Sequence, residues 1–462
     1  MDLIIKNGKL VSAYGVFEAD TGVEGGKIVS ISKSLDTQAG RVIDAAGKLV
    51  LPGLIDGHTH MEMPFMGTTT ADDFESGTAA AACGGVTTIV DFVVQAKGQS
   101  LLEAADAWRK KADPKVAVDY ALHLIIRDLN PSVLSEIGKA VSYGVAGFKL
   151  FMTYKKESLY LDDGSIFTVM KEAVKHGALV GLHCENADLI EHHNAEFLAE
   201  GKTSAEYHAY SRPPMVEAEA VHRGIALATL AGANMYVVHM STALACDIVK
   251  AAMDRGLPVF AETCPHYLTF TDEMYLKPNG RNYIMSPPLR KEDDKQKLWQ
   301  GLQEGFVQTV ASDHACFNTQ QKDMGKDDYT KVPNGTAGTE IILPILYSEG
   351  VRKGILSLDR LVRVTAYNPA KAFGLFPRKG QIAVGSDADL VVLDPQKKVK
   401  LTRDNLHSKL DHSIYEDITV TGYPVITVAR GEIVHEDGKF TGKKGGGVFV
   451  KREPYPTKRL EL

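Results

Sequence analysis

The central part of the chain repeats one pattern, in which a short apolar run rich in β-branched residues precedes a stretch with helical periodicity. Eight such runs occur: they end at residue 60 and cover 86–94, 117–126, 145–154, 178–186, 235–241, 257–264 and 306–314. Nearly continuous apolar strands that alternate with helices predict a parallel sheet covered by helices. Eight units over about 320 residues favour a TIM-like (β/α)8 barrel with insertions. The alternative is an open doubly wound sheet, but no Gly-x-Gly-x-x-Gly turn follows a strand, which weakens it.

The two ends of the chain differ from this centre. Short apolar bursts broken by glycine, such as "LIIKNGKLVS" and "GRVIDAAGKLVL", fill the first 51 residues, and the same style returns at "QIAVGSDADLVVLDP". Short strands separated by turns are the natural interpretation. We therefore expect one small β-sandwich built from residues 1–52 and 377–440, and a barrel over 53–376. Residues 441–462 lack the end of a P-loop, and we expect a solvated tail or a subunit contact there.

Polar side chains stand at the ends of several predicted strands. They are His58, His60, Lys149, His183, His239 and Asp313. All strands of a barrel deliver their carboxyl ends to one face, where the active site is built. Residues two apart on a strand point the same way, so His58 and His60 can both face inward. Each residue alone has an ordinary structural explanation, a hydrogen-bonded histidine or a helix cap for instance, but their joint placement favours a metal site.

Imidazole and carboxylate ligands suit zinc, and also manganese, cobalt or nickel. Six donors exceed the needs of one tetrahedral ion and suit two ions that share a bridge. A lysine ammonium would repel both cations. Lys149 must therefore be deprotonated or converted by carbon dioxide into a carbamate, whose two oxygens could bridge the ions.

Composition excludes other classes of function. The net charge of −6 argues against nucleic-acid binding. We find no apolar run of about 18 residues and no signal peptide, so neither a membrane span nor secretion is expected. The five cysteines are widely spread without a CxxC pair, which fits reduced thiols in a cytoplasmic protein.

The motifs around these residues resemble a known family. "GHTH" after the first strand, "GFKLFMTY", "HCEN", "VVHMS" and "ASDH", with the split terminal sandwich, are similar to the cyclic amidohydrolases, closest to dihydropyrimidinases and bacterial D-hydantoinases. The resemblance covers essentially the whole chain. Further matching stretches are "TADDFESGT", "YHAYSRPP", "ETCPHYL", "SPPLR", "PNG", "GLFPRKG" and "VGSDADLVV".

The resemblance implies a zinc-dependent opening of dihydropyrimidines or 5-substituted hydantoins to N-carbamoyl amino acids. His58 and His60 would bind the more buried of two ions with Asp313, and His183 and His239 the second. Lys149 would be the carboxylated bridge. A hydroxide between the ions would attack the ring carbonyl, and Asp313 would act as base and then acid.

Substrate contacts follow from the same resemblance. Tyr154 would steady the oxyanion by its hydroxyl, and the backbone groups of Ser286 and Asn334 would hold the cyclic amide. We also expect residues after strands one and four to form the pocket wall for the 5-substituent: Met63, Phe65, Met152 and Leu159. Relatives are commonly tetramers, so the resemblance implies a homo-oligomer with a small-molecule cyclic amide as its binding partner.

Related activities remain as alternatives. Dihydroorotases carry an arginine just after HxH, where this chain has Met61, which disfavours an orotate-like substrate. Allantoinases share the metal ligands and are the second hypothesis. A catalytically silent binding or assembly protein, like the collapsin-response mediator proteins, is the third, but this chain keeps all six ligand residues. One stretch departs from the D-hydantoinase pattern. After "PNG" the chain reads "TAGTEIILP", which is nearer to L-specific hydantoinases and allantoinases than to the D-hydantoinases.

Overall fold

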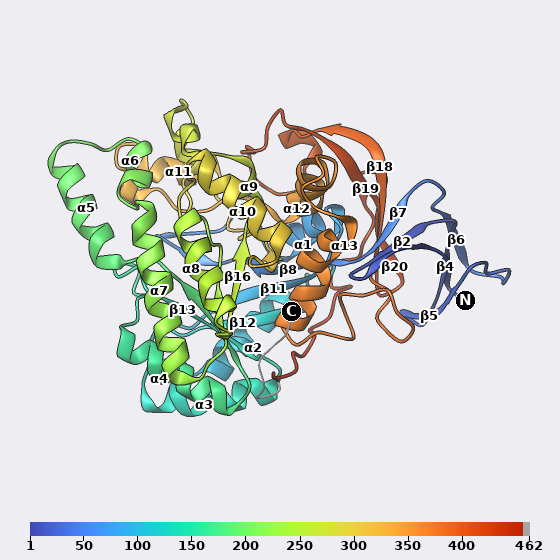
Figure 1. Cartoon of the computed structure of the whole chain (residues 1–462), viewed down its shortest axis with the longest axis horizontal. Coiled ribbons are helices and arrows are strands. Elements are labelled where there is room, and N and C mark those ends of the chain that lie inside the picture. The colour runs from blue at the N-terminus through green and yellow to red at the C-terminus, as the bar shows by residue number, and fades with distance from the viewer. Residues whose placement is uncertain (456–462) are drawn as a thin grey trace.

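The computed structural model describes residues 1–455 of the 462, and an eight-stranded parallel sheet lies at its centre (Figure 1). Its strands, in neighbouring order, are β8 (Leu54–Thr59), β11 (Val86–Val94), β12 (Asp119–Ile125), β13 (Gly147–Phe151), β14 (Leu179–His183), β15 (Met235–Val237), β16 (Val259–Thr263) and β17 (Thr309–Val310). The sheet closes where Thr59 forms a parallel bridge with His314, and the His60 N–H donates to the His314 carbonyl at 2.9 Å. The predicted (β/α)8 barrel is confirmed, and each of the eight apolar runs supplies one strand.

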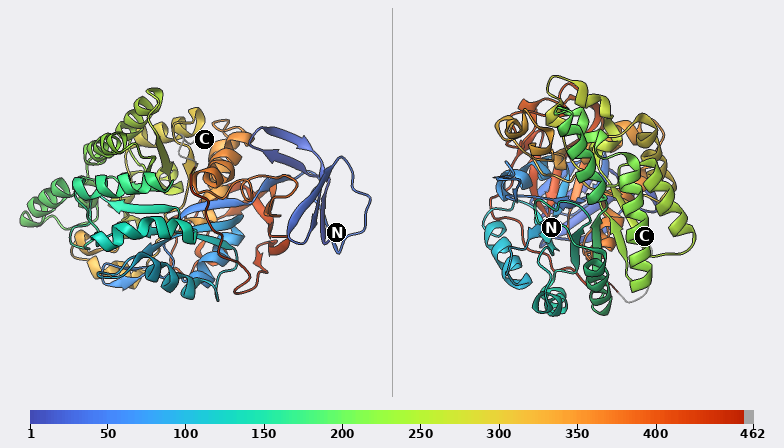
Figure 2. Two further views of the ribbon diagram at one scale, coloured as in Figure 1. Left: turned by 90° about the horizontal axis from the view of Figure 1, so that it is seen from below. Right: turned by 90° about the vertical axis from the view of Figure 1, so that its left-hand side faces the viewer.

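Helices follow the strands and cover the outside of the barrel (Figure 2). The longer ones are α1 (Phe74–Cys83), α2 (Leu101–Ala112), α3 (Pro131–Tyr143), α4 (Asp163–Lys175), α5 (Ala187–Ala199), α7 (Pro214–Ala231), α8 (Ala243–Asp254) and α10 (Glu292–Glu304). Shorter ones are α6 (Glu206–Tyr210), α9 (Pro265–Thr269), α11 (Thr319–Lys322), α12 (Ile342–Ile345), α13 (Leu358–Val362) and α14 (Asn368–Ala372). Local sequence sets their ends: Asn130 caps the first N–H groups of α3, and Gly144 ends that helix in the left-handed conformation, at φ 109°. Among the described residues, no helix combines the length and apolar character needed to cross a bilayer.

Both ends of the chain build the additional β-structure. A four-stranded sheet has the order β5 (Lys27–Ser32), β4 (Asp20–Glu24), β1 (Leu3–Lys6), β6 (Arg41–Asp44). A seven-stranded sheet has the order β21 (Lys439–Phe440), β20 (Glu432–Glu436), β19 (Thr419–Ala429), β18 (Leu390–Lys400), β7 (Leu49–Pro52), β2 (Lys9–Ser12), β3 (Gly15–Glu18). In Figure 1 the blue N-terminal strands lie beside the red β18 and β19. Their apolar side chains share one core, which includes Ile5, Val23, Val50, Leu390 and Val428, so the expected small domain from both termini is present.

A buried ionic cluster joins this small domain to the barrel. The ammonium of Lys379 lies 2.6 Å from Asp119, at the start of β12, 2.6 Å from Asp389 and 3.0 Å from Asp387. Arg430 adds a fifth charged group, with its Nε 2.9 Å from Asp119. The neighbouring carboxylates raise the pKa of Lys379 despite its burial, so the lysine stays charged.

The end of the described chain crosses the amino-terminal end of the barrel. The Val450 N–H donates to the Tyr120 carbonyl at 2.7 Å, and the Tyr120 N–H donates to the Val448 carbonyl at 3.0 Å. Val450, Arg452 and Tyr455 are buried. The guanidinium of Arg452 donates to the carbonyls of Phe373 and Leu122, at 2.8 and 3.0 Å. The described part of the tail is thus anchored on its own barrel by a few buried residues, while most of its other residues are exposed to solvent. Residues 456–462, part of the expected subunit contact, lie outside the described residues.

Candidate active site

A cavity of about 760 Å³ opens at the carboxyl ends of the barrel strands. All six residues predicted as metal ligands line it: His58, His60, Lys149, His183, His239 and Asp313. They come from the ends of β8, β13 and β14 and from the segments after β15 and β17. The barrel therefore brings together side chains that are up to 255 residues apart in sequence, from His58 to Asp313.

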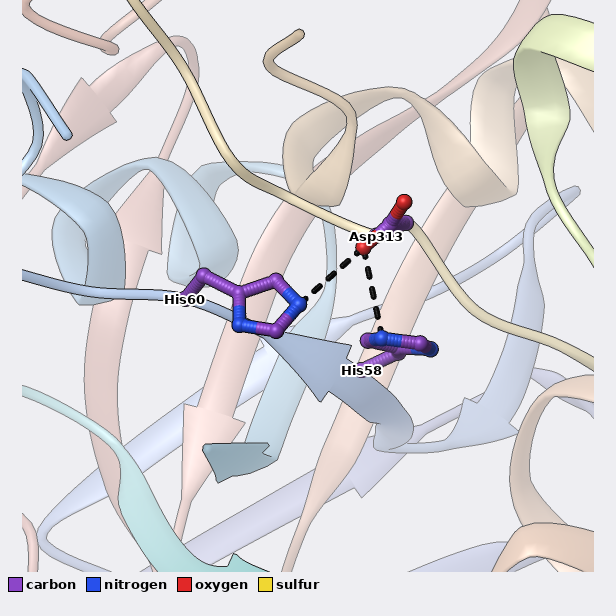
Figure 3. Close-up of side chains that lie close together, drawn as sticks. All are labelled: His58, His60 and Asp313. Carbon is purple, nitrogen blue, oxygen red and sulfur yellow. Dashed lines mark ion pairs between the residues drawn. The ribbon is translucent and has the colours of Figure 1, made fainter. Parts of the chain in front are cut away.

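Asp313 lies next to both His58, on β8, and His60, which directly follows that strand (Figure 3). One of its oxygens, Oδ1, is 3.3 Å from His58 Nε2 and 3.2 Å from His60 Nε2. The backbone of Asp313 has φ 47°, in the left-handed region that few residues other than glycine adopt. Such a conformation persists only where the surrounding structure enforces it, and it is concentrated at functional sites.

The other three residues complete the floor of the cavity. The rings of His183 and His239 lie 4.4 Å apart between centroids, and that of His239 lies 5.3 Å from the ring of His58. Lys149 is only 1% exposed, and its ammonium lies 5.4 Å from the ring of Phe92. His239 also has a positive φ, of 39°. His58, His183 and His239 are thus neighbours, and they line the cavity together with Lys149.

Burial shifts the protonation of these groups toward the forms that bind cations. It lowers the pKa of His60 to about 4 and that of His239 well below its ordinary value, so both imidazoles are neutral at pH 7. It also lowers the pKa of Lys149 to about 8, where a substantial neutral fraction is available for reaction with carbon dioxide. Burial opposes ionisation of Asp313, but the surrounding histidines outweigh it and hold the pKa of that carboxyl well below its usual range.

Four polar atoms at the site are buried and have no hydrogen-bond partner within residues 1–455. They are His58 Nε2, His60 Nδ1, Lys149 Nζ and His239 Nδ1. A buried polar atom left unpaired costs about 1–3 kcal/mol, so four together in one place indicate a missing partner. His58, His60 and Asp313 also bring three ligand atoms within 4.8 Å of one another. These donors are the types that divalent transition metals bind, and they fit such a cofactor.

Two buried glutamates orient the histidines from behind. Glu262, on β16, lies 2.7 Å from His58 Nδ1 and also accepts a hydrogen bond from the Tyr236 hydroxyl at 2.9 Å. Glu185 lies 2.7 Å from His183 Nε2. A carboxylate behind a ligating imidazole fixes its tautomer and raises its basicity. The sequence pattern does not single out these glutamates, although Glu262 begins "ETCPHYL" and Glu185 lies in "HCEN", two of the stretches that carry the family resemblance.

The three predicted substrate contacts form one hydrogen-bonded group on the cavity wall. The Asn334 side-chain amide donates to the hydroxyl of Tyr154 at 3.1 Å and to Oγ of Ser286 at 3.0 Å. Among the described residues, no hydrogen bond engages the backbone carbonyls of Ser286 and Asn334. These carbonyls therefore remain open to a ligand.

A buried lysine braces the segments that carry Ser286 and Asn334. Lys322 donates three hydrogen bonds, to the carbonyls of Ile284 at 2.8 Å, Pro333 at 2.7 Å and Gly335 at 2.8 Å. An ammonium has three N–H donors, so these carbonyls satisfy it completely. Nothing in the sequence pattern pointed to Lys322, because its acceptors are backbone atoms of distant segments.

The expected pocket wall is mostly at the cavity. Met63, Phe65 and Leu159 line it, together with Val94 and Ile125. Met152 does not: it is 1% exposed and belongs to the core between barrel and helices. Side chains alternate along an extended segment, so Lys149 and Phe151 face the barrel interior while Leu150 and Met152 face outward. The expectation for Met152 is corrected on that ground.

The fold and the donor set define a class of protein, the hydrolases of the (β/α)8 barrel type that use a divalent metal. Residues 49–434 match the amidohydrolase family, and the chain belongs to that family. A D-hydantoinase of Geobacillus stearothermophilus is 45% identical over 460 residues, which is 98% of this chain and 97% of that protein. These matches confirm the family that the motifs indicated.

Solved structures of relatives agree with the fold. The dihydropyrimidinase of Brevibacillus agri NCHU1002 superposes with a TM-score of 0.97 at 43% identity, over 99% of this chain and 100% of that one. The L-hydantoinase (dihydropyrimidinase) of Arthrobacter aurescens gives a TM-score of 0.91 at 34% identity, over 98% of this chain and 100% of that one. The chain is thus similar over its whole length to enzymes of both stereochemical names, with higher identity to the D-hydantoinase.

Proposed function

We propose that the protein hydrolyses the cyclic amide bond of dihydropyrimidines or 5-substituted hydantoins and releases N-carbamoyl amino acids. One observation carries the proposal: the six ligand-type residues and the Tyr154–Asn334–Ser286 group line the same cavity. Full-length similarity to a D-hydantoinase and a dihydropyrimidinase supports it. The alternative of a silent binding protein is not favoured, because all six positions keep their donor side chains.

We propose two Zn²⁺ ions per chain as the cofactor. His58, His60 and Asp313 would hold one and His183 and His239 the other, with Lys149, converted to its carbamate, between them. When bound, such ions polarise the substrate carbonyl and lower the pKa of water to near neutrality. The carbamate supplies the negative charge that the site otherwise lacks, since Asp313 is the single carboxylate among the six.

Asp313 moves the proton in this proposal. Its carboxylate accepts a proton from the water whose oxygen attacks the ring carbonyl carbon. It then returns that proton to the ring nitrogen as the C–N bond breaks, so one residue serves as base and then acid. His58 and His60 lie at nearly equal distances from Oδ1 of Asp313, 3.3 and 3.2 Å, and keep this carboxyl ionised before it accepts the proton.

Tyr154 stabilises the negative charge that develops on the carbonyl oxygen. Its hydroxyl already accepts a hydrogen bond from Asn334, which leaves its own proton free to donate into the cavity. The open carbonyls of Ser286 and Asn334 accept from the ring N–H groups and hold the ring in place. Met63, Phe65 and Leu159 face the substituent on the ring.

The structure also bears on the related activities. Met61 stands where a dihydroorotase has its arginine, and it is fully buried against α1, where a Cβ on Gly77 would lie 2.1 Å from its sulfur. A ring carboxylate would find no cation there. The relatives described above are hydantoinases and dihydropyrimidinases, so allantoinase activity is the less favoured alternative.

A substrate panel with purified, zinc-loaded protein tests the proposal. Ring opening is followed for dihydrouracil, hydantoin, D- and L-5-substituted hydantoins, allantoin and dihydroorotate. We expect turnover of the first four and little of the last two. Allantoin as the best substrate would replace the proposed activity, and a protein that binds metal but opens none of the rings would refute it.

We propose that the protein is a cytoplasmic homotetramer, by analogy with the tetrameric relatives named in the sequence analysis. Sedimentation equilibrium of the purified protein tests the assembly, and a monomer at micromolar concentration would contradict it.

A further inference from the structure

An arginine stands at the mouth of the cavity, just past the end of the third barrel strand. Arg127 follows β12, and the inward-facing residues His123 and Ile125 precede it at intervals of two. Ile126 still pairs with β13, its N–H donating to the carbonyl of Lys149 at 3.2 Å, so the alternation extends past the strand end. Both Ile125 and Arg127 accordingly line the cavity.

The backbone at Arg127 is held in place. Its N–H donates to Oε1 of Gln95 at 3.2 Å, and Gln95 is fully buried. The guanidinium, in contrast, has neither a hydrogen bond nor an ion pair within residues 1–455. Arginine pairs readily with carboxylates because its five N–H donors match their two oxygens. A half-buried arginine with a fixed backbone and no partner, facing a substrate cavity, is suited to a ligand.

Other charges around the cavity do not neutralise Arg127. Lys156 and Glu157, on the loop after β13, also line the cavity, and no ion pair within residues 1–455 joins Glu157 to Arg127. Lys331 is paired with Asp328, at 3.1 Å. Asp313 belongs to the donor group at the cavity floor. Arg127 is therefore a partly buried cation at this mouth that no carboxylate within residues 1–455 pairs with.

An apolar surface connects the cavity floor with this arginine. Ile125, Phe151 and Leu159 pack with Phe92 in one cluster, and Phe65 and Val94 border it. The members that line the cavity lie on the same strands and loops as Lys149 and Arg127. A substituent on the ring at the floor would cross this surface before it reaches the guanidinium.

We propose that the site takes cyclic amides whose 5-substituent is an apolar spacer with a terminal carboxylate, and that Arg127 binds that carboxylate. The substrate class is then 5-(carboxyalkyl)hydantoins or the equivalent dihydropyrimidines. This inference rests on the proposed function. It differs from recognition of a ring carboxylate by a residue next to the HxH pair, because Arg127 follows β12 whereas that pair stands at the end of β8.

The test compares each acid with its uncharged isostere. Hydantoins carrying a carboxymethyl, carboxyethyl or carboxypropyl group are assayed beside the matching primary amides, and kcat/KM is measured for each. For the wild type we expect the acid to be favoured for at least one spacer length. Arg127→Gln lowers that acid-to-amide ratio by about tenfold or more, because a charge-assisted hydrogen-bonded pair is lost. Arg127→Lys keeps part of the preference, and added salt weakens the wild-type preference.

A matched control removes the same charge elsewhere. Arg255 is an exposed arginine at the carboxyl end of α8 and does not line the cavity. Arg255→Gln should leave the acid-to-amide ratio unchanged. Turnover of the amides shows in each variant that the protein is folded and loaded with metal. An equal ratio in wild type and Arg127→Gln would overturn the inference while the proposed function stands, whereas no turnover of any ring would overturn both.

Discussion

The side-chain amide of Asn334 donates a hydrogen bond to the hydroxyl of Tyr154, with 3.1 Å between Nδ2 and the phenolic oxygen. The second proton of the same amide is directed to Ser286, so its orientation is fixed. Burial raises the pKa of Tyr154, which keeps the hydroxyl protonated at neutral pH. The backbone of Tyr154 has φ 63°, a left-handed conformation that turns this side chain back over the cavity. Asn334 therefore aims the one proton that Tyr154 can give.

The first prediction concerns the loss of the Tyr154 hydroxyl proton. Tyr154→Phe should lower kcat by about a hundredfold or more and change KM little, because the lost donor acts on charge that develops in the transition state. Asn334→Ala should lower kcat by less, and the double variant should lose less than the sum of both effects. Steady-state kinetics on hydantoin and dihydrouracil measure this, and unchanged kcat in Tyr154→Phe would exclude the role.

Glu262 is expected to act through His58. Glu262→Gln keeps the shape but weakens the contact with His58 Nδ1, and it should reduce metal affinity or activity by about 10- to 100-fold. Metal content after dialysis against a weak chelator is the direct measurement. Glu304→Gln, an exposed site at the end of α10, serves as the control. Equal metal retention in the Glu262 and Glu304 variants would contradict the orienting role.

Lys149 should be replaceable by an added carboxylate. Lys149→Ala is expected to lose both metal and activity, and short carboxylic acids such as propionate should restore part of each by occupying the place of the carbamate. Metal analysis and activity against acid concentration give the result. Full activity of the plain alanine variant would show that no carbamate is needed. Mass spectrometry under native conditions can detect the added carbon dioxide.

The ionic cluster at Lys379 should matter for stability. Lys379→Met leaves three carboxylates buried with less positive charge, and we expect a loss of about 3–5 kcal/mol in the free energy of unfolding. Lys353→Met is the control: Lys353 pairs with Glu349 at the surface, with 60% of its side chain exposed, and should change stability by less than about 0.5 kcal/mol. Urea titrations measure the free energy of unfolding of both variants. Equal midpoints would contradict the larger loss expected for Lys379→Met.

Lys322 makes stability depend on pH with a definite sign. Burial lowers the pKa of Lys322 to about 7, whereas a lysine in the unfolded chain titrates near 10.4. Between those values the unfolded state binds one proton more than the folded state, so stability rises with pH by up to about 1.4 kcal/mol per unit. The Tm of the wild type minus that of Lys322→Met should therefore increase from pH 7.5 to 9.5. A constant difference would place the folded pKa outside this window.

The sequence predicted the barrel because the property that decides it is local and repeated. Runs such as 86–94 and 145–154 are mostly apolar on both faces, which is typical of strands in a covered parallel sheet. Because parallel strands place their carboxyl ends on one face of a barrel, the order of the runs also predicted that His58, Lys149 and Asp313 lie close together. The local sequence pattern agrees with the global fold, and for this reason the positions of these site residues could be predicted as well.

The features that the sequence did not predict depend on direction or on distant backbone. Met152 was placed on the wall because of its position after a strand, but the alternation that turns it outward depends on where that strand begins. Glu262 and Lys322 act on atoms of other segments, and no spacing rule connects residue 322 with carbonyls at 284 and 333. The anchoring of residues 450–455 is also not predicted, since this part of the chain has a polar composition while Arg452 is buried.

The mixed origin of the seven-stranded sheet constrains the order of events during synthesis. β2, β3 and β7 leave the ribosome first, yet their neighbour β18 follows more than 330 residues later, counting from Pro52 to Leu390. At about 5–20 residues per second the early strands wait on the order of tens of seconds, with their pairing edge open. The barrel can be complete before its small domain exists. A carboxyl-terminal truncation would consequently damage the first strands made as well as the last, and the nascent amino-terminal segment is where a chaperone would be needed most.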